Sequence, residues 1–213
     1  GLDRINVSLD SLRRETFERI TGADLLERVW QGLDAAQAAG FPLKLNVVAM
    51  RHVNDAEAAD FARLTLERPF EVRFIEFYPT NERSRRLVDA LITSAETRAA
   101  IERRLGPLEE LPAERGCGPA RVYKLPGAKG RIGFISGRSD YFCGSCNRVR
   151  MDCTGRIFPC LFSPSTHNLK ELLRSGAPEE ALTDYIKKAF LVKSNYRKDS
   201  DTAGHIEMSS LGG

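Results

Sequence analysis

The 213-residue sequence lacks an apolar run of the roughly 18 residues that a membrane-spanning helix needs, and nothing in it resembles a signal peptide. It also lacks a long basic run, and its formal net charge of +3 allows an anionic ligand without indicating nucleic-acid binding. Its five cysteines are odd in number, and the chain is long for a disulfide scaffold. We therefore expect a reduced, cytoplasmic protein that binds neither a membrane nor nucleic acid.

An initiating methionine is also missing. The sequence begins with Gly1, Leu2 and Asp3 and enters a strand pattern almost at once, so we interpret it as a fragment whose upstream part is missing. With 42% apolar residues, the chain has enough hydrophobic material to bury a core.

Strand and helix patterns alternate over the first 78 residues. Strands are expected at 3–11, 42–50 and 70–78, with a helical segment before Gly40, which would end it, and a helix over 54–67. Asn54 or Asp55 is the expected cap of the latter helix. This order predicts an α/β fold with right-handed crossovers and therefore parallel strands.

Polar residues occupy alternate positions of the first two strands. Asn6, Ser8 and Asp10 would share one face of the first strand, and Lys44 and Asn46 one face of the second. Strands covered by helices on both sides are usually almost entirely apolar. The pattern therefore predicts a lumen or groove that holds something polar, with an exposed sheet face as the alternative.

The character of the chain changes after residue 79, and we place a boundary between the two parts near 79–92. A helix is expected over 92–106. Beyond it, Gly- and Pro-rich sequence suggests short strands around 121–125, 131–136, 147–153 and 156–158, followed by helices near 168–175 and 178–191.

Four cysteines lie within the stretch YFCGSCNRVRMDCTGRIFPC. Together, Cys143, Cys146, Cys153 and Cys160 would suit a tetrahedral zinc site, in which His167 is an alternative fourth ligand. Without Cys153, the other three would suit a [4Fe–4S] cluster with one iron open to a non-protein ligand. Disulfides are a third interpretation, which the expected reducing compartment opposes. Spacing alone does not separate iron–sulfur from zinc.

Two arginines stand among these cysteines. Strand alternation predicts that Arg148 and Arg150 share a face and that Cys153 lies on the other, beside a tight turn at Thr154 and Gly155. That position favours a structural role for Cys153. The two guanidinium groups would bind a phosphate chain through bidentate hydrogen bonds.

Several of these stretches resemble the GTP 3',8-cyclase family, the radical S-adenosylmethionine (SAM) enzymes that begin molybdenum cofactor biosynthesis. The stretches are RINVSLDSL, LKLNVV, RFIEF, FCGSCNRVRMDCTGRIFPCLF and the terminal Gly-Gly, in family order and over essentially the whole chain. The resemblance implies the C-terminal part of an incomplete TIM-like (β/α)6 barrel in residues 1–82. It implies an α+β iron–sulfur region with the Gly-Gly tail in residues 83–213.

The resemblance also implies a chemistry. In the family, one [4Fe–4S] cluster on a C-x3-C-x2-C motif cleaves SAM to a 5'-deoxyadenosyl radical, which takes hydrogen from C3' of GTP, and that carbon then attacks C8 of the guanine. A second cluster binds GTP through its open iron. The implied product is (8S)-3',8-cyclo-7,8-dihydroguanosine 5'-triphosphate, which a cyclic pyranopterin monophosphate synthase uses downstream. Assembly as a homodimer is an open alternative.

Site residues follow from the family motifs. The implied ligands of the second [4Fe–4S] cluster are Cys143, Cys146 and Cys160; the implied GTP contacts are Lys44, Arg148, Val149 and Arg150; and the implied SAM contacts are Ser8 and Tyr78. Tyr78 stands where the family usually has Met, so its contact would have to use the backbone. Arg73 is an additional phosphate ligand in this interpretation, and Gly212 and Gly213 would reach toward the active site.

The chain lacks a motif and several strands that the family has. It contains no C-x3-C-x2-C motif, and the first three strands of the family barrel are missing. Three parallel strands cannot close a barrel, and an exposed edge at residues 3–9 would favour aggregation. We expect that this chain alone does not start the radical reaction, and we assign it no catalytic residue. The alternative function is a zinc-stabilised nucleotide-binding or interaction module without a redox role.

Overall fold

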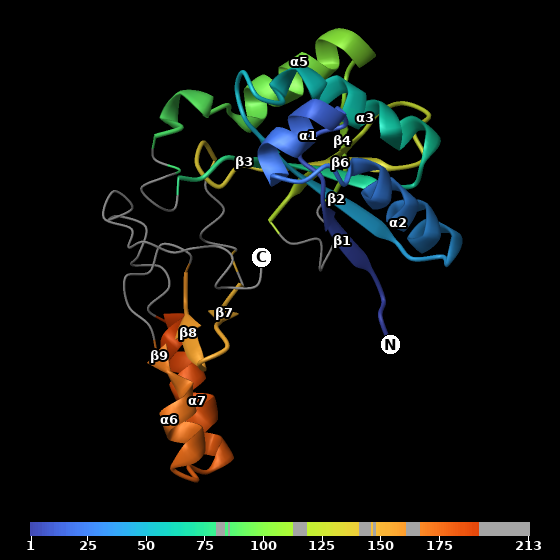
Figure 1. Cartoon of the computed structure of the whole chain (residues 1–213). Helices are drawn as coiled ribbons and strands as arrows, with labels where there is room; N and C mark the ends of the chain where they lie inside the picture. The colour runs from blue at the N-terminus through green and yellow to red at the C-terminus, as the bar shows by residue number, and fades with distance from the viewer. Residues whose placement is uncertain are drawn as a thin grey trace. The chain divides into compact units, whose positions relative to one another are not determined.

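The fold is that of a computed structural model (Figure 1), which describes residues 1–79, 84, 86–112, 119–140, 146, 148–160 and 167–191. The chain forms two compact units. The first comprises Gly1–Phe77 and Asp89–Tyr141, and the second comprises Tyr78–Val88 and Phe142–Gly213. Across the described ranges, none of the helices has the length and apolar character needed to cross a membrane.

A six-stranded sheet forms the centre of the first unit. Its order is β1 (Ile5–Ser8), β2 (Leu43–Ala49), β3 (Glu71–Glu76), β6 (Arg131–Ile135), β5 (Arg121–Lys124) and β4 (Glu109–Glu110). β1, β2, β3 and β6 are parallel, which confirms the predicted parallel arrangement, and β5 and β4 continue the sheet in antiparallel fashion. The strands β4–β6 therefore extend this sheet with sequence from beyond residue 82. The closure of a barrel stays a prediction.

Helices α1 (Arg14–Thr21), α2 (Leu26–Ala38), α3 (Ala58–Glu67) and α5 (Ser94–Leu105) cover one face of this sheet (Figure 1). Alternate strand residues point into the core beneath them, and Leu45, Val72 and Ile132 are fully buried there. Phe74 stacks on Phe134 with a centroid distance of 5.7 Å. The apolar face of the sheet therefore packs into the core, and the polar residues of the sheet lie on the opposite face.

Two expected helix ends have different outcomes. Gly40 follows α2 with φ of 81°, and its N–H donates to the Gln37 carbonyl at 3.0 Å, which confirms that it ends this helix. The expected cap at Asn54 or Asp55 is wrong. A 3-10 turn, η1 (Asp55–Glu57), precedes α3, and Asn54 makes no side-chain cap bond. Its amide instead donates to the carbonyls of Asp10 at 2.7 Å and Val48 at 2.8 Å, because the ends of β1 and β2 lie beside it.

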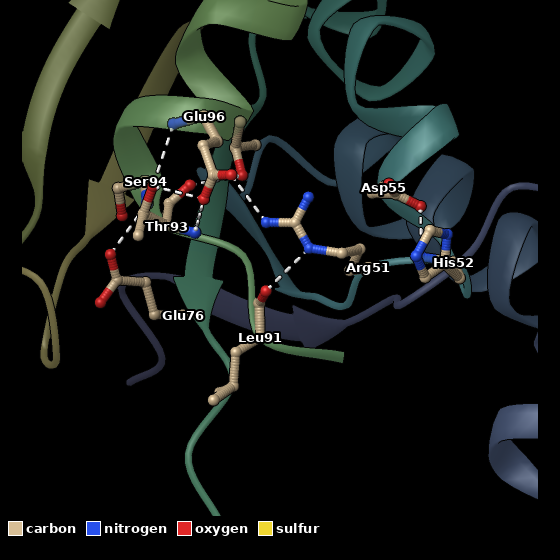
Figure 2. Close-up of polar contacts among 9 residues, drawn as sticks. Arg51, His52, Asp55, Glu76, Leu91, Thr93, Ser94 and Glu96 are labelled. Atoms are coloured by element: carbon tan, nitrogen blue, oxygen red, sulfur yellow. Dashed lines mark hydrogen bonds and ion pairs between the residues drawn. The ribbon is translucent and has the colours of Figure 1, made fainter. Parts of the chain in front are cut away.

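The helix predicted over 92–106 is α5, preceded by the short turn η2 (Val88–Ala90). Thr93 caps α5, and its hydroxyl accepts from the Glu96 N–H at 3.2 Å while the Glu96 carboxylate accepts from the Thr93 N–H at 2.9 Å (Figure 2). Arg51 adds an ion pair to Glu96 at 2.7 Å. The hydrogen bonds from Arg51 and then Thr93 lower the pKa of Glu96 to about 2.

This capping box predicts an acid-dependent loss of stability. A carboxylate whose folded pKa is lowered stabilises the fold above its unfolded pKa near 4.5, and that contribution disappears as the pH falls toward 2. Glu96→Gln should therefore lower the urea midpoint at pH 7 and have a shrinking effect between pH 4.5 and 2. Glu109→Gln on exposed β4 is the control. A difference between Glu96→Gln and wild type that stays constant across this range would contradict the prediction.

The second unit contains a small antiparallel sheet, β7 (Arg150–Met151), β8 (Arg156–Phe158) and β9 (His167–Asn168), with helices α6 (Leu169–Arg174) and α7 (Glu179–Leu191). Within the described part of the strand expected over 147–153, which begins at residue 148, Arg150–Met151 form β7. The predicted turn is confirmed, because Gly155 has φ of 82° and the Asp152 carboxylate accepts from the Thr154 N–H at 2.9 Å. Both expected helices are present.

Candidate functional site

Polar side chains gather on the face of the parallel sheet that lies opposite the apolar core. The register pairs Asn6 with Lys44 and Ser8 with Asn46. Paired residues of parallel strands point to the same side, so the polar faces predicted for the first two strands form one continuous surface. We call this surface, made by alternate residues of β1, β2 and β3, the polar sheet face.

A charged cluster lies on the polar sheet face between β2 and β3. Glu71 forms ion pairs with Lys44, between Oε2 and Nζ at 3.3 Å, and with Arg73, between Oε1 and Nε at 2.5 Å. The three side chains are only 11–12% exposed. The formal charges of these three side chains add up to +1. Glu71 was missed from the sequence, although its spacing of two from Arg73 shows that both share a strand face.

Gly133 makes room for this cluster. It pairs with Arg73 across β3 and β6, and a Cβ at its position would approach the Arg73 Cγ to 3.2 Å. That separation is tighter than ordinary packing, so a side chain at Gly133 would displace the arginine stem. The glycine therefore leaves room for the Arg73 side chain in its position beside Glu71.

Asn46 carries an unsatisfied acceptor on the same face. Its Oδ1 is buried and has no hydrogen-bond partner in the part of the chain that the structure describes. The register places Asn46 between Ser8 and Arg73. Because buried polar atoms in folded proteins nearly always have a partner, this oxygen indicates a position where a ligand or a water donates a hydrogen bond.

The carboxyl ends of β1 and β2 are joined by Asp10 and Asn54. The Asp10 carboxylate accepts from the Val48 N–H at 2.8 Å, and burial raises its pKa more than this bond lowers it. The side-chain Oδ1 of Asn54 accepts from the Met50 N–H at 2.7 Å. These bonds fix the strand ends beside the polar sheet face, where Ser8 lies with its side chain exposed.

The cysteine stretch belongs to the second unit. Cys146, Arg148, Val149, Arg150 and Cys160 are half-buried there, and Cys143 lies outside the described residues. Within the described ranges, His, Cys, Asp and Glu side chains form no group of three that would hold a metal ion, so the cluster ligand set stays a prediction. Tyr78, the expected SAM contact, is half-buried at the start of the same unit.

The predicted strand alternation of Arg148 and Arg150 is tested at only one of the two residues. β7 begins at Arg150, which pairs with Phe158, so the expected common face with Arg148 stays a prediction. Cys153 lies beside the tight turn and is exposed, and its expected structural role stays a prediction. Hydrogen bonds from Thr154 and Arg156 lower the pKa of Asp152 in this turn to about 2.

His167, the alternative zinc ligand, lies in β9. Its ring meets the Tyr185 ring edge to face at 5.8 Å between centroids. Its Nε2 is buried and has no partner among the residues that the structure describes. This nitrogen favours the zinc interpretation.

Comparison with known proteins identifies the family. The Radical SAM superfamily matches residues 1–65, and Molybdenum Cofactor Synthesis C matches residues 70–198. GTP 3',8-cyclase of Heliobacterium modesticaldum is 45% identical over 91% of this chain and 59% of its own length. The enzymes of the same name from Desulforamulus reducens and Cyanothece sp. are 41% and 44% identical over 100% of this chain and 66% and 68% of their own lengths.

The chain spans about three fifths to two thirds of the length of these relatives. The matches nevertheless extend across both structural units, and the two family matches follow each other along the sequence. This chain therefore belongs to the GTP 3',8-cyclase family of radical SAM proteins.

Proposed function

We propose that this chain is the GTP-binding part of a GTP 3',8-cyclase, which converts GTP to (8S)-3',8-cyclo-7,8-dihydroguanosine 5'-triphosphate in molybdenum cofactor biosynthesis. The observation that carries the proposal is the Lys44–Glu71–Arg73 cluster on the polar sheet face. A cluster of two cations and one carboxylate, nearly excluded from water, is suited to an anion such as a triphosphate. The family relationship supplies the identity of that anion.

Lys44 would bind the phosphates directly. An ammonium group has three donors, and the 3.3 Å contact with Glu71 leaves capacity for an incoming oxygen. Glu71 holds both cations in place before the ligand arrives, which reduces the entropy lost on binding. Arg73 would add planar hydrogen bonds to the same phosphate chain.

Asn46 would bind the sugar of the nucleotide. It follows Lys44 by two residues, so the two side chains stand roughly 7 Å apart along the strand. A ribose hydroxyl lies at a comparable distance from the phosphates and can donate to the buried Asn46 Oδ1. Ser8, on the neighbouring strand, would then contact SAM, with Tyr78 contributing its backbone.

Cys143, Cys146 and Cys160 would hold a [4Fe–4S] cluster in the second unit. Thiolates are the usual protein ligands of such a cluster, and Cys146 and Cys160 are half-buried, while Cys143 lies outside the described residues. When bound, the cluster would supply an open iron for the guanine. Arg148, Val149 and Arg150 would also be GTP contacts. The SAM-cleaving cluster requires a C-x3-C-x2-C motif that this sequence does not contain.

A zinc-stabilised nucleotide-binding module is the second candidate, favoured by the buried His167 Nε2. The metal distinguishes the two, because iron–sulfur protein is brown and zinc protein is colourless. Metal analysis of anaerobically purified chain tests this directly.

Titration with nucleotides tests the proposed function. Anaerobically reconstituted chain should bind GTP at least tenfold more tightly than ATP in a calorimetric titration, because the guanine adds contacts at the cluster to those of the triphosphate. Equal affinities would show that only phosphates are recognised. An absence of GTP binding at millimolar concentration would contradict the proposal.

A further inference from the structure

Arg131, the first residue of β6, lies in line with the charged cluster of the polar sheet face. The register pairs Lys44 with Glu71 and Glu71 with Arg131 across β2, β3 and β6. Paired residues of parallel strands point to the same side, so the half-buried Arg131 shares the face of Lys44 and Glu71. Its strand neighbours Ile132 and Phe134 alternate with the residues of this face, and Ile132 is buried in the core. β6 therefore adds a cation to the row of charges on this face.

The backbone of Arg131 is fixed against the start of β3. Its N–H donates to the Phe70 carbonyl at 2.9 Å, and the Gly130 N–H donates to the Thr65 carbonyl at 2.8 Å. A Cβ at Gly130 would lie 2.1 Å from the Phe70 oxygen, so this close approach requires glycine. Binding of a ligand by Arg131 would therefore not have to order this part of the backbone, which reduces the entropy lost on binding.

The surroundings of Arg131 leave it able to bind an anion. The next residue of β6 on this face is Gly133, which has no side chain and pairs with Arg73. Glu71 lies between the cations, and its Oε1 and Oε2 contact Arg73 and Lys44. A guanidinium group has five N–H donors, so Arg131 can bind an oxygen of a ligand in addition to its other contacts.

Of the cations Lys44, Arg73 and Arg131, Arg131 lies farthest from Asn46, the residue proposed to bind the sugar. Lys44 is two residues from Asn46 on the same strand, and Arg73 pairs with Asn46 on the next strand. Arg131 is two strands away from β2, about 10 Å across the sheet, and is also displaced by two residues along it. A phosphate chain that begins near Asn46 and is held by Lys44 and Arg73 would therefore reach Arg131 with its terminal phosphate.

We propose that Arg131 binds the terminal phosphate of the nucleotide and thereby selects a triphosphate over a diphosphate. The proposal rests on the proposed function, since that function places a guanine nucleotide on the polar sheet face. A planar guanidinium can form two parallel hydrogen bonds with one phosphate. GDP lacks the phosphate that makes this contact but keeps the groups that bind Lys44 and Arg73.

Calorimetric titration of GTP and GDP into the anaerobically reconstituted full chain tests the proposal. Wild type should bind GTP about tenfold or more tightly than GDP, because a hydrogen bond to a charged group contributes about that factor. Arg131→Gln should lose this preference and bind GDP as wild type does. Arg121→Gln is the matched control, because Arg121 pairs with Phe134 and so points to the opposite face of the same sheet. It should keep the wild-type preference.

The ratio of the two affinities decides the role of Arg131. A preference for GTP that Arg131→Gln retains overturns the proposal, and so does an equal loss of affinity for both nucleotides in this variant. Wild type that binds GTP and GDP equally also overturns it, although the proposed function then still stands.

Two further arms cover the remaining cases. If wild type binds neither nucleotide, the proposed function fails, and inorganic triphosphate and pyrophosphate are titrated instead. A preference for triphosphate that disappears in Arg131→Gln then supports the role of Arg131, and any other result overturns it. If Arg131→Gln does not fold, Arg131→Lys keeps the charge without the planar fork. A smaller preference for GTP in that variant supports the proposal, and an unchanged preference overturns it.

Discussion

Replacement of Cys143 or Cys160 by alanine is expected to abolish iron binding, whereas Cys153→Ala should leave it intact. A cluster held by three thiolates loses one of its few protein ligands when any of them is removed, and two thiolates do not retain it. Cys153 is exposed beside the Thr154–Gly155 turn, where its thiol lies at the surface. Iron and sulfide per chain, together with absorbance near 400 nm, measure the effect after anaerobic reconstitution.

The expected iron content is about four per chain for wild type and Cys153→Ala, and close to zero for the other two variants. Cys153→Ala is the matched control because it removes a thiol from the same segment. The opposite pattern, loss in Cys153→Ala together with bound zinc in wild type, would establish a four-ligand zinc site. His167→Ala would then show whether this histidine takes part.

Lys44→Ala is expected to weaken GTP binding by about 10- to 100-fold. A hydrogen bond to a charged group contributes about 1.5–3 kcal/mol, and each 1.4 kcal/mol corresponds to a factor of ten in affinity. The fold should tolerate the change, because Glu71 keeps its 2.5 Å contact with Arg73. Calorimetric titration of GTP into the reconstituted variant measures the affinity.

Two further variants make this experiment specific. Lys129→Ala removes an exposed lysine from the same unit and should bind GTP as wild type does. Glu71→Gln removes the anion between two nearly buried cations and should lower the free energy of unfolding by up to about 3–5 kcal/mol. Equal GTP affinity in Lys44→Ala and Lys129→Ala would exclude the polar sheet face as the nucleotide site.

Local patterns in the sequence were enough to predict much of the candidate site. The period-two alternation of RINVSLD and LKLNVV placed Ser8, Lys44 and Asn46 on a polar strand face, and the register of β1 and β2 confirms it. Gly40 and the helix over 92–106 were also predicted correctly, since caps and helix periodicity depend on neighbouring residues. The family was identifiable because its motifs are short and contiguous.

Other features depend on residues that are far apart in sequence, and only the tertiary structure decided them. β6 is a fourth parallel strand because Arg131–Ile135 pairs with β3, and no local pattern specifies a strand's neighbour. Asn54 resembles a helix cap in sequence, yet its side chain bonds to the ends of β1 and β2. Glu71 and Glu76 both lie in β3 but point to opposite faces of the sheet. Glu71 contacts Lys44 and Arg73, whereas Glu76 contacts the start of α5 and residue 139. Sequence determined which residues alternate and where elements begin and end, because those properties are set within a few residues. Contacts between side chains that are distant in sequence depended on how the strands pair and the helices pack. Those contacts supply the partners of the buried charges.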